Sequence, residues 1–264
     1  MTLPCRQRTG GERSTSWKNG TVYREWPPPA DLEAFVECFW SRRMYAEGGA
    51  HVVLPDGHID VLFELEPQAR GFVVGAMTRP LDVPSRSVQI LAVRFKPGAA
   101  SVFIGDDAVR FNDSVVALDE VRRDGGTLAA RLANAGPGRQ AAAITAELRT
   151  IYADAVIPGP VVHATRHLTQ AASSIERTVC RELGISRQSL AREFRRHVGL
   201  TPKEFAAVMR MQRAVAALRD PASKIATVAL ACGYYDQAHM TAEMKRFTGK
   251  PPGLLKVASA QPSL

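Results

Sequence analysis

The sequence has few cysteines and no long apolar stretch, and these absences exclude several classes of protein. Its four cysteines (Cys5, Cys38, Cys180 and Cys232) form no Cys-x-x-Cys pair and no zinc-finger spacing. No segment approaches the roughly 20 apolar residues that cross a bilayer, and residues 1–20 lack the apolar run of a secretory signal. We therefore expect a cytoplasmic protein with reduced thiols, no metal site and no membrane partner.

The sequence also lacks the short motifs of common enzymes. It contains no G-x-S-x-G, no P-loop and no H-E-x-x-H, so we expect neither an enzyme nor a bound cofactor. In one alternative, the N-terminal half is an enzymatic module that accepts an alkyl group on Cys38. That chemistry needs an activated thiolate, and no histidine or basic residue adjoins Cys38 in the sequence. Methyl transfer from alkylated DNA to Cys38 would distinguish this alternative.

Basic residues are concentrated in the C-terminal half of the chain, whose formal net charge is +8. Residues 161–264 contain 16 lysines and arginines against 7 acidic residues, whereas residues 1–160 contain 18 against 19. A basic domain binds polyanions through the release of condensed counterions, whatever its sequence preference. The charge alone fits a solvated surface equally well, but the motifs in the same half favour a nucleic acid partner.

Two helix-turn-helix patterns follow one another in this basic half. The first spans Val179 to Phe194 and the second spans Ile225 to Met240. Each contains a short apolar helix, a glycine at the break, a polar N-cap residue and a second amphipathic helix, which is the unit that places a helix in the DNA major groove. A helix that starts at Thr201-Pro202 joins the two units and is predicted to hold them at a fixed separation.

The outward faces of the two second helices supply the candidate DNA contacts. Arginine pairs with guanine edges and glutamine with adenine edges, so the first helix is predicted to read bases. The second helix has fewer such groups, and we expect from it phosphate contacts, shape fit or contact with thymine methyls. The predicted base-contacting residues are Gln188, Ser189, Arg192, Arg196, Ala238, His239 and Ala242. The predicted phosphate-contacting residues are Arg187, Arg195, Thr201, Gln237, Lys245, Arg246 and Lys250.

The N-terminal half has the pattern of a small mixed α/β, β-rich domain, and an all-α domain follows it, so the fold class is α+β. Strands are predicted at 51–54, 59–65, 72–74 and 88–95, and helices at 32–40, 99–104 and 113–154. Pro158-Gly159-Pro160 breaks helix at the point where the charge balance changes. The predicted organisation is a flexible tail (1–20), a sensor or dimerisation domain (21–157), a tandem helix-turn-helix domain (158–257) and a second tail (258–264).

Four residues of the N-terminal half are candidates for an effector site: Trp40, His58, Asp60 and Arg94. Arg94 lies in an otherwise apolar strand, and an inward-facing arginine must be paired. It either holds a carboxylate ligand or pairs with an acid of the protein such as Asp60 or Glu64. Trp40 could line a pocket, although core packing is the simpler interpretation.

Two groups of residues could suggest a metal site. His51, His58 and Asp60 with Cys38 have neither helical nor finger spacing, so we interpret them as solvated or hydrogen-bonded polar residues. His163 and His167 lie at positions i and i+4, but two imidazoles make an incomplete site. We interpret this pair as part of a surface helix.

Residues around the two helix-turn-helix units form a long and specific constellation between about 175 and 255. It includes Leu183-Gly184-Ile185-Ser186, Gly199-Leu200-Thr201-Pro202, Ala231-Cys232-Gly233-Tyr234 and Lys245-Arg246-Phe247-Thr248-Gly249. This constellation resembles the DNA-binding domain of the AraC/XylS family of transcription regulators. The resemblance implies two units on a long connecting helix that enter adjacent major-groove segments, roughly 10 bp apart.

The N-terminal half is similar to a sensor-like domain that is attached to some of these regulators. The similar segments are 54–63, 93–100 and 113–121. The resemblance implies a bacterial-type transcription factor, activator or repressor, whose partners are double-stranded promoter DNA and RNA polymerase. It also implies that the N-terminal domain binds an unknown small-molecule effector, forms a homodimer, or does both.

Overall fold

The computed structural model describes residues 13–16, 22–44, 51–84, 86–136, 138–170 and 176–255. The N-terminal half is built on a seven-stranded antiparallel sheet in the order β1-β2-β3-β8-β5-β6-β9. Its strands are β1 (Arg13–Ser16), β2 (Val22–Trp26), β3 (Val36–Met44), β5 (Ile59–Glu66), β6 (Arg70–Val74), β8 (Val88–Phe95) and β9 (Val115–Ala117). A separate two-stranded sheet pairs β4 (His51–Val53) with β7 (Leu81–Val83).

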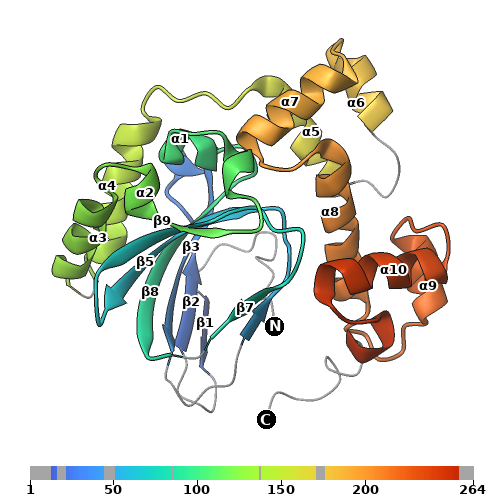
Figure 1. Ribbon diagram of the computed structural model, residues 1–264, viewed down its shortest axis with the longest axis horizontal. Coiled ribbons are helices and arrows are strands. Elements are labelled where there is room, and N and C mark those ends of the chain that lie inside the picture. Colours follow the sequence, from blue (N-terminus) through green and yellow to red (C-terminus); the bar gives the residue numbers. More distant parts are fainter. Residues whose placement is uncertain are drawn as a thin grey trace.

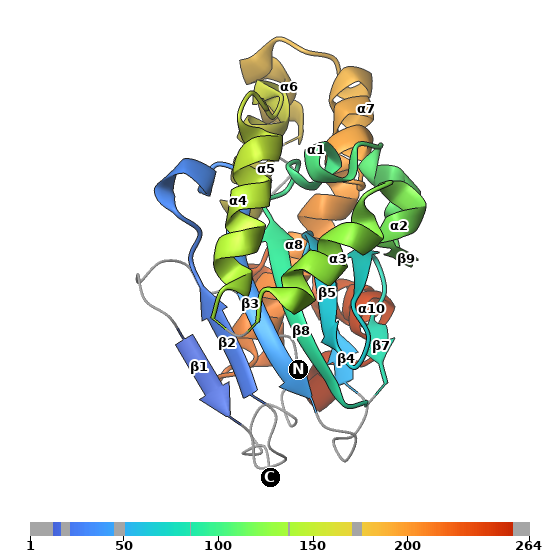
Figure 2. The same cartoon turned by 90° about the vertical axis from the view of Figure 1, so that its left-hand side faces the viewer.

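Alternation of apolar side chains explains why these segments form strands with one face covered. In β5, Ile59, Val61 and Phe63 are buried, whereas Asp60 and Leu62 point to the other face of the sheet and are partly exposed. Short helices cover the apolar face (Figures 1 and 2). They are η1 (Ala30–Leu32), α1 (Ala100–Ile104), η2 (Ala108–Phe111), α2 (Leu118–Val121), α3 (Gly125–Asn134) and α4 (Gln140–Tyr152).

Two of the predicted helices are wrong in part. Residues 36–40 belong to β3, because Phe39 packs into the main core while Trp40 packs against a second apolar cluster on the opposite face of the sheet. Residues 115–117 form β9, which pairs with β6 along one edge of the sheet. The predicted strands at 51–54, 59–65, 72–74 and 88–95 are confirmed, and so is the short helix at 99–104.

The C-terminal half consists of helices, as predicted. They are α5 (Gly159–Gln170), α6 (Glu176–Leu183), α7 (Arg187–His197), α8 (Pro202–Ala217), α9 (Ile225–Ala231) and α10 (Gln237–Thr248). Helix α8 runs alongside the N-terminal domain, with α5, α6 and α7 at one end and α9 and α10 at the other (Figure 1). Buried apolar side chains form one cluster that continues from the sheet into these helices. Within the described ranges, no helix has the length and apolar character needed to cross a membrane.

Candidate nucleic-acid interface

The first helix-turn-helix unit comprises α6 and α7, and local chemistry fixes the turn between them. Gly184 has a φ of +63°, a left-handed conformation that favours glycine. The side chain of Ser186 accepts a hydrogen bond of 3.0 Å from the backbone N–H of Ser189 and so caps α7. Leu190 and Phe194 are fully buried. Capping and burial together fix which face of α7 is turned outward.

The outward face of α7 carries six of the side chains predicted to contact DNA. Arg192 has 75% of its side chain exposed and lies 3.6 Å from the Glu193 carboxylate. Arg196 is 62% exposed, whereas Ser189 is half-buried. The other exposed members of this face are Arg187, Gln188 and Arg195. The face is therefore cationic and open to a polyanion.

Helix α8 begins with a capping box that involves Thr201, a predicted phosphate contact. The Thr201 hydroxyl accepts a hydrogen bond from the Glu204 backbone N–H at 3.1 Å and donates one to the Glu204 carboxylate at 2.7 Å. Its side chain is therefore already engaged in capping. Sixteen residues of α-helix span about 24 Å at 1.5 Å per residue, so α8 keeps the two units well apart.

The second unit comprises α9 and α10, and a partly buried ion pair joins it to α8. The Asp236 side chain accepts from the His239 backbone N–H at 2.7 Å and caps α10. Arg210 of α8 donates two hydrogen bonds to the Glu243 carboxylate, at 3.0 and 2.5 Å, and its guanidinium lies 4.9 Å from the Tyr234 ring centre. Glu243 faces α8 and is 11% exposed, because it is the partner of Arg210.

The outward face of α10 presents the other predicted DNA contacts. All of them are exposed: Gln237, Ala238, His239, Ala242, Lys245, Arg246 and Lys250. The Arg246 guanidinium lies 4.4 Å from the Phe247 ring centre, which limits the freedom of that side chain. Tyr235 is 87% exposed directly before the Asp236 cap. It is a further candidate contact that sequence reasoning missed, although its place next to the N-terminus of α10 could have indicated it.

The N-terminal domain contacts the C-terminal end of α7. Arg196 Nε lies 3.3 Å from Asp107 Oδ1, and the Ser101 hydroxyl lies 3.0 Å from His197 Nδ1. The Asn112 side-chain amide also donates to the Gly199 carbonyl. These partners are about 90 residues apart in sequence, so no local pattern could have paired them. The structure thus places one of the predicted base-contacting residues, Arg196, at the boundary between the two halves.

A loop between β4 and β5 contacts helix α8. Gly57 has a φ of +76°, and a Cβ atom at this position would lie 2.8 Å from Met209 Cε and 2.9 Å from Phe205 Cε2. The Gln212 side-chain amide donates to the Pro55 carbonyl. The close approach requires a residue without a side chain at position 57, so the loop and α8 pack directly on one another.

The same loop leads into a partly buried polar cluster that brings together three of the four predicted effector residues. Arg94 donates two hydrogen bonds to Asp60, at 3.0 and 2.9 Å, and lies 3.1 Å from Asp56. His58 Nδ1 lies 3.0 Å from the Asp56 carbonyl. Of the alternatives for Arg94, the structure shows the pairing with Asp60, whereas Glu64 pairs with Arg86. Carboxylates of the protein contact the Nε and Nη2 atoms of the Arg94 guanidinium.

Neighbouring charges in this cluster shift the pKa values of Asp56 and His58. Burial alone would raise the pKa of Asp56, but the Arg94 guanidinium and the hydrogen bonds from His58 hold that pKa well below its usual range. Burial would likewise lower the pKa of His58, but its contact with the Asp56 carboxylate outweighs burial and raises it. The ionised form of Asp56 is therefore favoured, and the carboxylates of Asp56 and Asp60 both contact the Arg94 guanidinium.

Trp40, the fourth predicted effector residue, lies on the same face of the sheet. It pairs with Ala92, two residues before Arg94 on β8, and residues two apart in a strand share a face. Tyr23 stacks against it, with the ring centres 6.1 Å apart. The indole Nε1 of Trp40 is buried and has no hydrogen-bond partner among the described residues.

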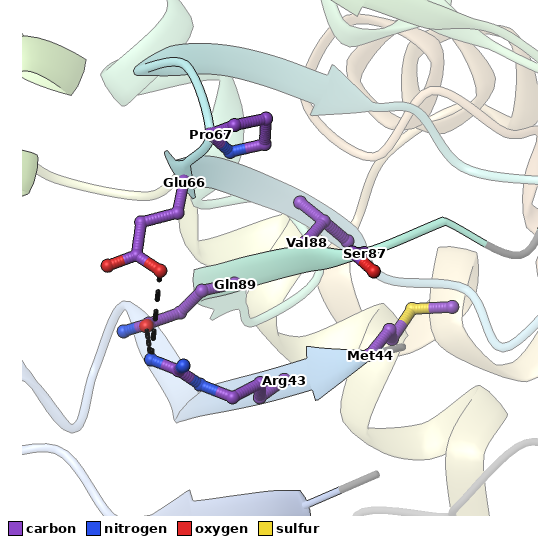
Figure 3. Close-up of a pocket in the computed structure, with 7 residues that line it drawn as sticks. All are labelled: Arg43, Met44, Glu66, Pro67, Ser87, Val88 and Gln89. Carbon is purple, nitrogen blue, oxygen red and sulfur yellow. Dashed lines mark hydrogen bonds and ion pairs between the residues drawn. The ribbon is translucent and has the colours of Figure 1, made fainter. Parts of the chain in front are cut away.

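A pocket of about 280 Å³ opens at the other end of the sheet. Figure 3 shows its lining, in which Arg43, Glu66 and Gln89 interact with one another. The full lining is Arg43, Met44, Glu66, Pro67, Ser87, Val88 and Gln89. None of the predicted effector residues lines this pocket, so the predicted site and this cavity are separate.

The geometry bears on the alternative in which Cys38 accepts an alkyl group. Cys38 lies in the middle of the sheet, opposite Arg94 on β8, and is 3% exposed. A base in alkylated DNA would have to reach a sulfur atom that is almost completely buried. This burial argues against the alternative. Cys180 and Cys232 are also buried and belong to no disulfide within the described residues, while Cys5 lies outside the described residues.

Comparisons with known proteins find two family matches, in separate parts of the chain. A family described as a helix-turn-helix domain matches residues 179–256. A family described as a domain of unknown function (DUF6597) matches residues 24–117. No curated protein sequence matches the chain.

Several solved structures are similar to the chain at low identity. An AraC-type transcriptional regulator from Chromobacterium violaceum is 22% identical over 39% of this chain and 95% of its own, with a TM-score of 0.35. The C-terminal domain of AraT, a response regulator from Geobacillus stearothermophilus, is 18% identical over 41% and 93%, with a TM-score of 0.38. ToxT from Vibrio cholerae is 10% identical over 91% and 98%, with a TM-score of 0.43.

Proposed function

We propose that this chain, an AraC-type DNA-binding transcription regulator, reads two successive major-groove segments of promoter DNA with α7 and α10. The observation that carries the proposal is the pair of exposed, capped helices held at the two ends of α8. Arg210 and Glu243 fasten α10 to α8, and Arg213 donates to the Thr169 carbonyl at the end of α5. Such a rigid spacing suits two grooves on one side of the duplex.

The two helices contribute different kinds of DNA contact. Helix α7 offers Gln188, Arg192 and Arg196, whose side chains can form paired hydrogen bonds with adenine or guanine edges. Helix α10 offers Ala238 and Ala242 on the corresponding face, which suit apolar contact with thymine methyls, and Lys245 and Arg246, which suit phosphates. We therefore assign most of the sequence preference to the first unit and much of the electrostatic affinity to the second.

We further propose that residues 21–157 form a sensor domain and residues 158–257 the DNA-binding domain. The effector site is the polar cluster of His58, Asp60 and Arg94, together with Trp40 on the same face. The carboxylates of Asp56 and Asp60 and the side chains of Arg94 and His58 bring hydrogen-bond donors and acceptors together, which favours a polar effector. The buried indole N–H of Trp40 supplies a donor for a second group.

A change at this cluster has a direct route to the DNA-binding helices. Asp56 contacts Arg94, and its neighbours Pro55 and Gly57 pack on Gln212, Phe205 and Met209 of α8. A ligand that displaces Asp56 from Arg94 therefore moves the loop that touches α8. An effector would in this way change the position of the linker helix and of both units.

The experiment that tests the function is selection of binding sites for the purified full-length protein from random duplex DNA at near-physiological salt. We expect an enriched motif with two segments about one helical turn apart, roughly 10 bp. Repetition of that motif within the selected sites would indicate two copies of the chain on the DNA. Binding at low salt without any enriched motif would contradict sequence-specific reading and indicate binding by charge alone.

A further inference from the structure

Two histidines of α5 and a glutamate of α6 lie together on the surface of the first helix-turn-helix unit. His163 and His167 are one helical turn apart, and their ring centres are separated by 4.3 Å. Glu182 reaches them from α6, with its Oε2 atom 3.0 Å from His163 Nε2 and 3.9 Å from His167 Nε2. One potential ligand atom from each residue lies within 4.8 Å of the others.

We propose that His163, His167 and Glu182 form a binding site for a divalent transition-metal ion such as Zn²⁺. Imidazole nitrogens and carboxylate oxygens are ligands that zinc prefers, with bonds of about 2.0–2.2 Å. Tetrahedral bonds of that length place neighbouring ligand atoms about 3.3 Å apart. The two nitrogen–oxygen distances, 3.0 and 3.9 Å, lie on either side of this value, so small side-chain rotations complete the geometry.

The surroundings suit an ion that exchanges with solvent. The three side chains are 36%, 39% and 45% exposed for His163, His167 and Glu182, which leaves a path for entry and room for water as a fourth ligand. Three protein ligands with one open position are fewer than the four of a closed structural site. We therefore infer a site that binds and releases its ion as the ion's concentration changes.

A metal ion at this site would join α6, in the first helix-turn-helix unit, to α5. Helix α6 is the first helix of that unit, and α5 packs against α6, α7 and α8. The Thr169 carbonyl near the end of α5 already accepts a hydrogen bond from Arg213 of α8. A metal ion that bridges α5 and α6 adds a second link to α5, besides the hydrogen bond from Arg213, and restricts the movement of α6. Metal binding at this position does not depend on the identity of the DNA site.

The test uses the full-length chain without an affinity tag, after treatment with a chelator. Co²⁺ is titrated first, because its visible absorption reports nitrogen and oxygen ligands in a low-coordinate site, and Zn²⁺ is then added to displace it. We expect a visible band that saturates at one ion per chain. His163→Ala, His167→Ala and Glu182→Gln should each weaken binding about tenfold or more.

A matched control separates the site from general surface charge. Glu120→Gln removes an equivalent carboxylate from an exposed position on α2 and should leave the titration unchanged. Because Zn²⁺ binds the folded state, it should also raise the melting temperature of the unmodified chain but not that of the His163→Ala/His167→Ala double variant. Circular dichroism without metal shows whether each variant is folded.

Two results would overturn the proposal. One is the absence of a saturating Co²⁺ band up to millimolar metal in the folded, unmodified chain. The other is an unchanged affinity in the folded double variant, which would place the ion elsewhere on the chain. Neither result would bear on DNA binding, because site selection is carried out separately.

Discussion

Arg196 of helix α7 lies 3.3 Å from Asp107 of the N-terminal half, measured from Nε to Oδ1. A side chain that is equipped to contact DNA is thus shared with the domain that would sense an effector. Both partners are more than half exposed, at 62% and 53%. An ion pair at such a position is weak, about 0.2–1 kcal/mol, and is screened by salt.

Asp107→Ala should therefore tighten DNA binding modestly. Loss of the carboxylate frees Arg196 and removes a negative charge from the edge of the DNA-binding surface. The expected gain is at most about fivefold at low salt, which corresponds to about 1 kcal/mol, and it should fade as salt rises. Fluorescence anisotropy with a selected DNA site measures it. Asp106→Ala is the control, since Asp106 pairs with Arg110 inside the N-terminal domain; an equal gain in that variant would refute a specific role for Asp107.

Arg192→Ala should weaken binding to the selected site by about 1–3 kcal/mol and relax the preference for the base pair that this side chain contacts. The reason is its outward position on α7, where 75% of the side chain is exposed. Repeating the site selection with the variant measures the change. Arg139→Ala, which removes an exposed arginine from the N-terminal half, is the control. Uniform weakening on every DNA sequence would show instead that Arg192 contacts only phosphate.

Arg246→Ala should reduce the dependence of affinity on salt without changing the sequence preference. Arg246 is exposed on the last turn of α10, where it is placed to contact a phosphate. Loss of one phosphate contact lowers the slope of log K against log salt by about one unit. Binding measured over a series of salt concentrations gives this slope. A change in the selected motif would contradict the assignment, because it would mean that Arg246 reads a base.

Gly57→Ala should loosen the contact between the β4–β5 loop and α8. The new methyl group would meet Met209 and Phe205 at 2.8–2.9 Å, and the positive φ of +76° adds backbone strain. We expect a loss of about 2–4 kcal/mol in the free energy of unfolding, measured by denaturant titration.

Gly105→Ala is a closely matched control for that substitution. Gly105 has the same φ of +76°, but no atom lies within 4 Å of the added Cβ. It should therefore cost only the backbone strain, about 1–2 kcal/mol. Equal losses in the two variants would mean that the loop yields freely and that position 57 does not hold α8.

The sequence by itself determined the helix-turn-helix half. The apolar spacing of Leu190 and Phe194, and the caps at Ser186, Thr201 and Asp236, depend on residues only three or four positions apart. Interactions of that range are encoded locally. For the same reason the pattern of apolar and polar residues is enough to assign most of the exposed faces of α7 and α10.

Tertiary structure alone decided the strand at Val36–Met44 and the contacts between segments that are distant in sequence. Residues 32–40 have apolar side chains at helical spacing, yet Val36–Met44 is a strand, because β2 and β8 offer it partners on both sides. The inward turn of Glu243 and the pairing of Asp107 with Arg196 likewise join segments that are distant in sequence. Contacts of this kind form only when the chain has closed long loops. A local sequence pattern therefore cannot predict them.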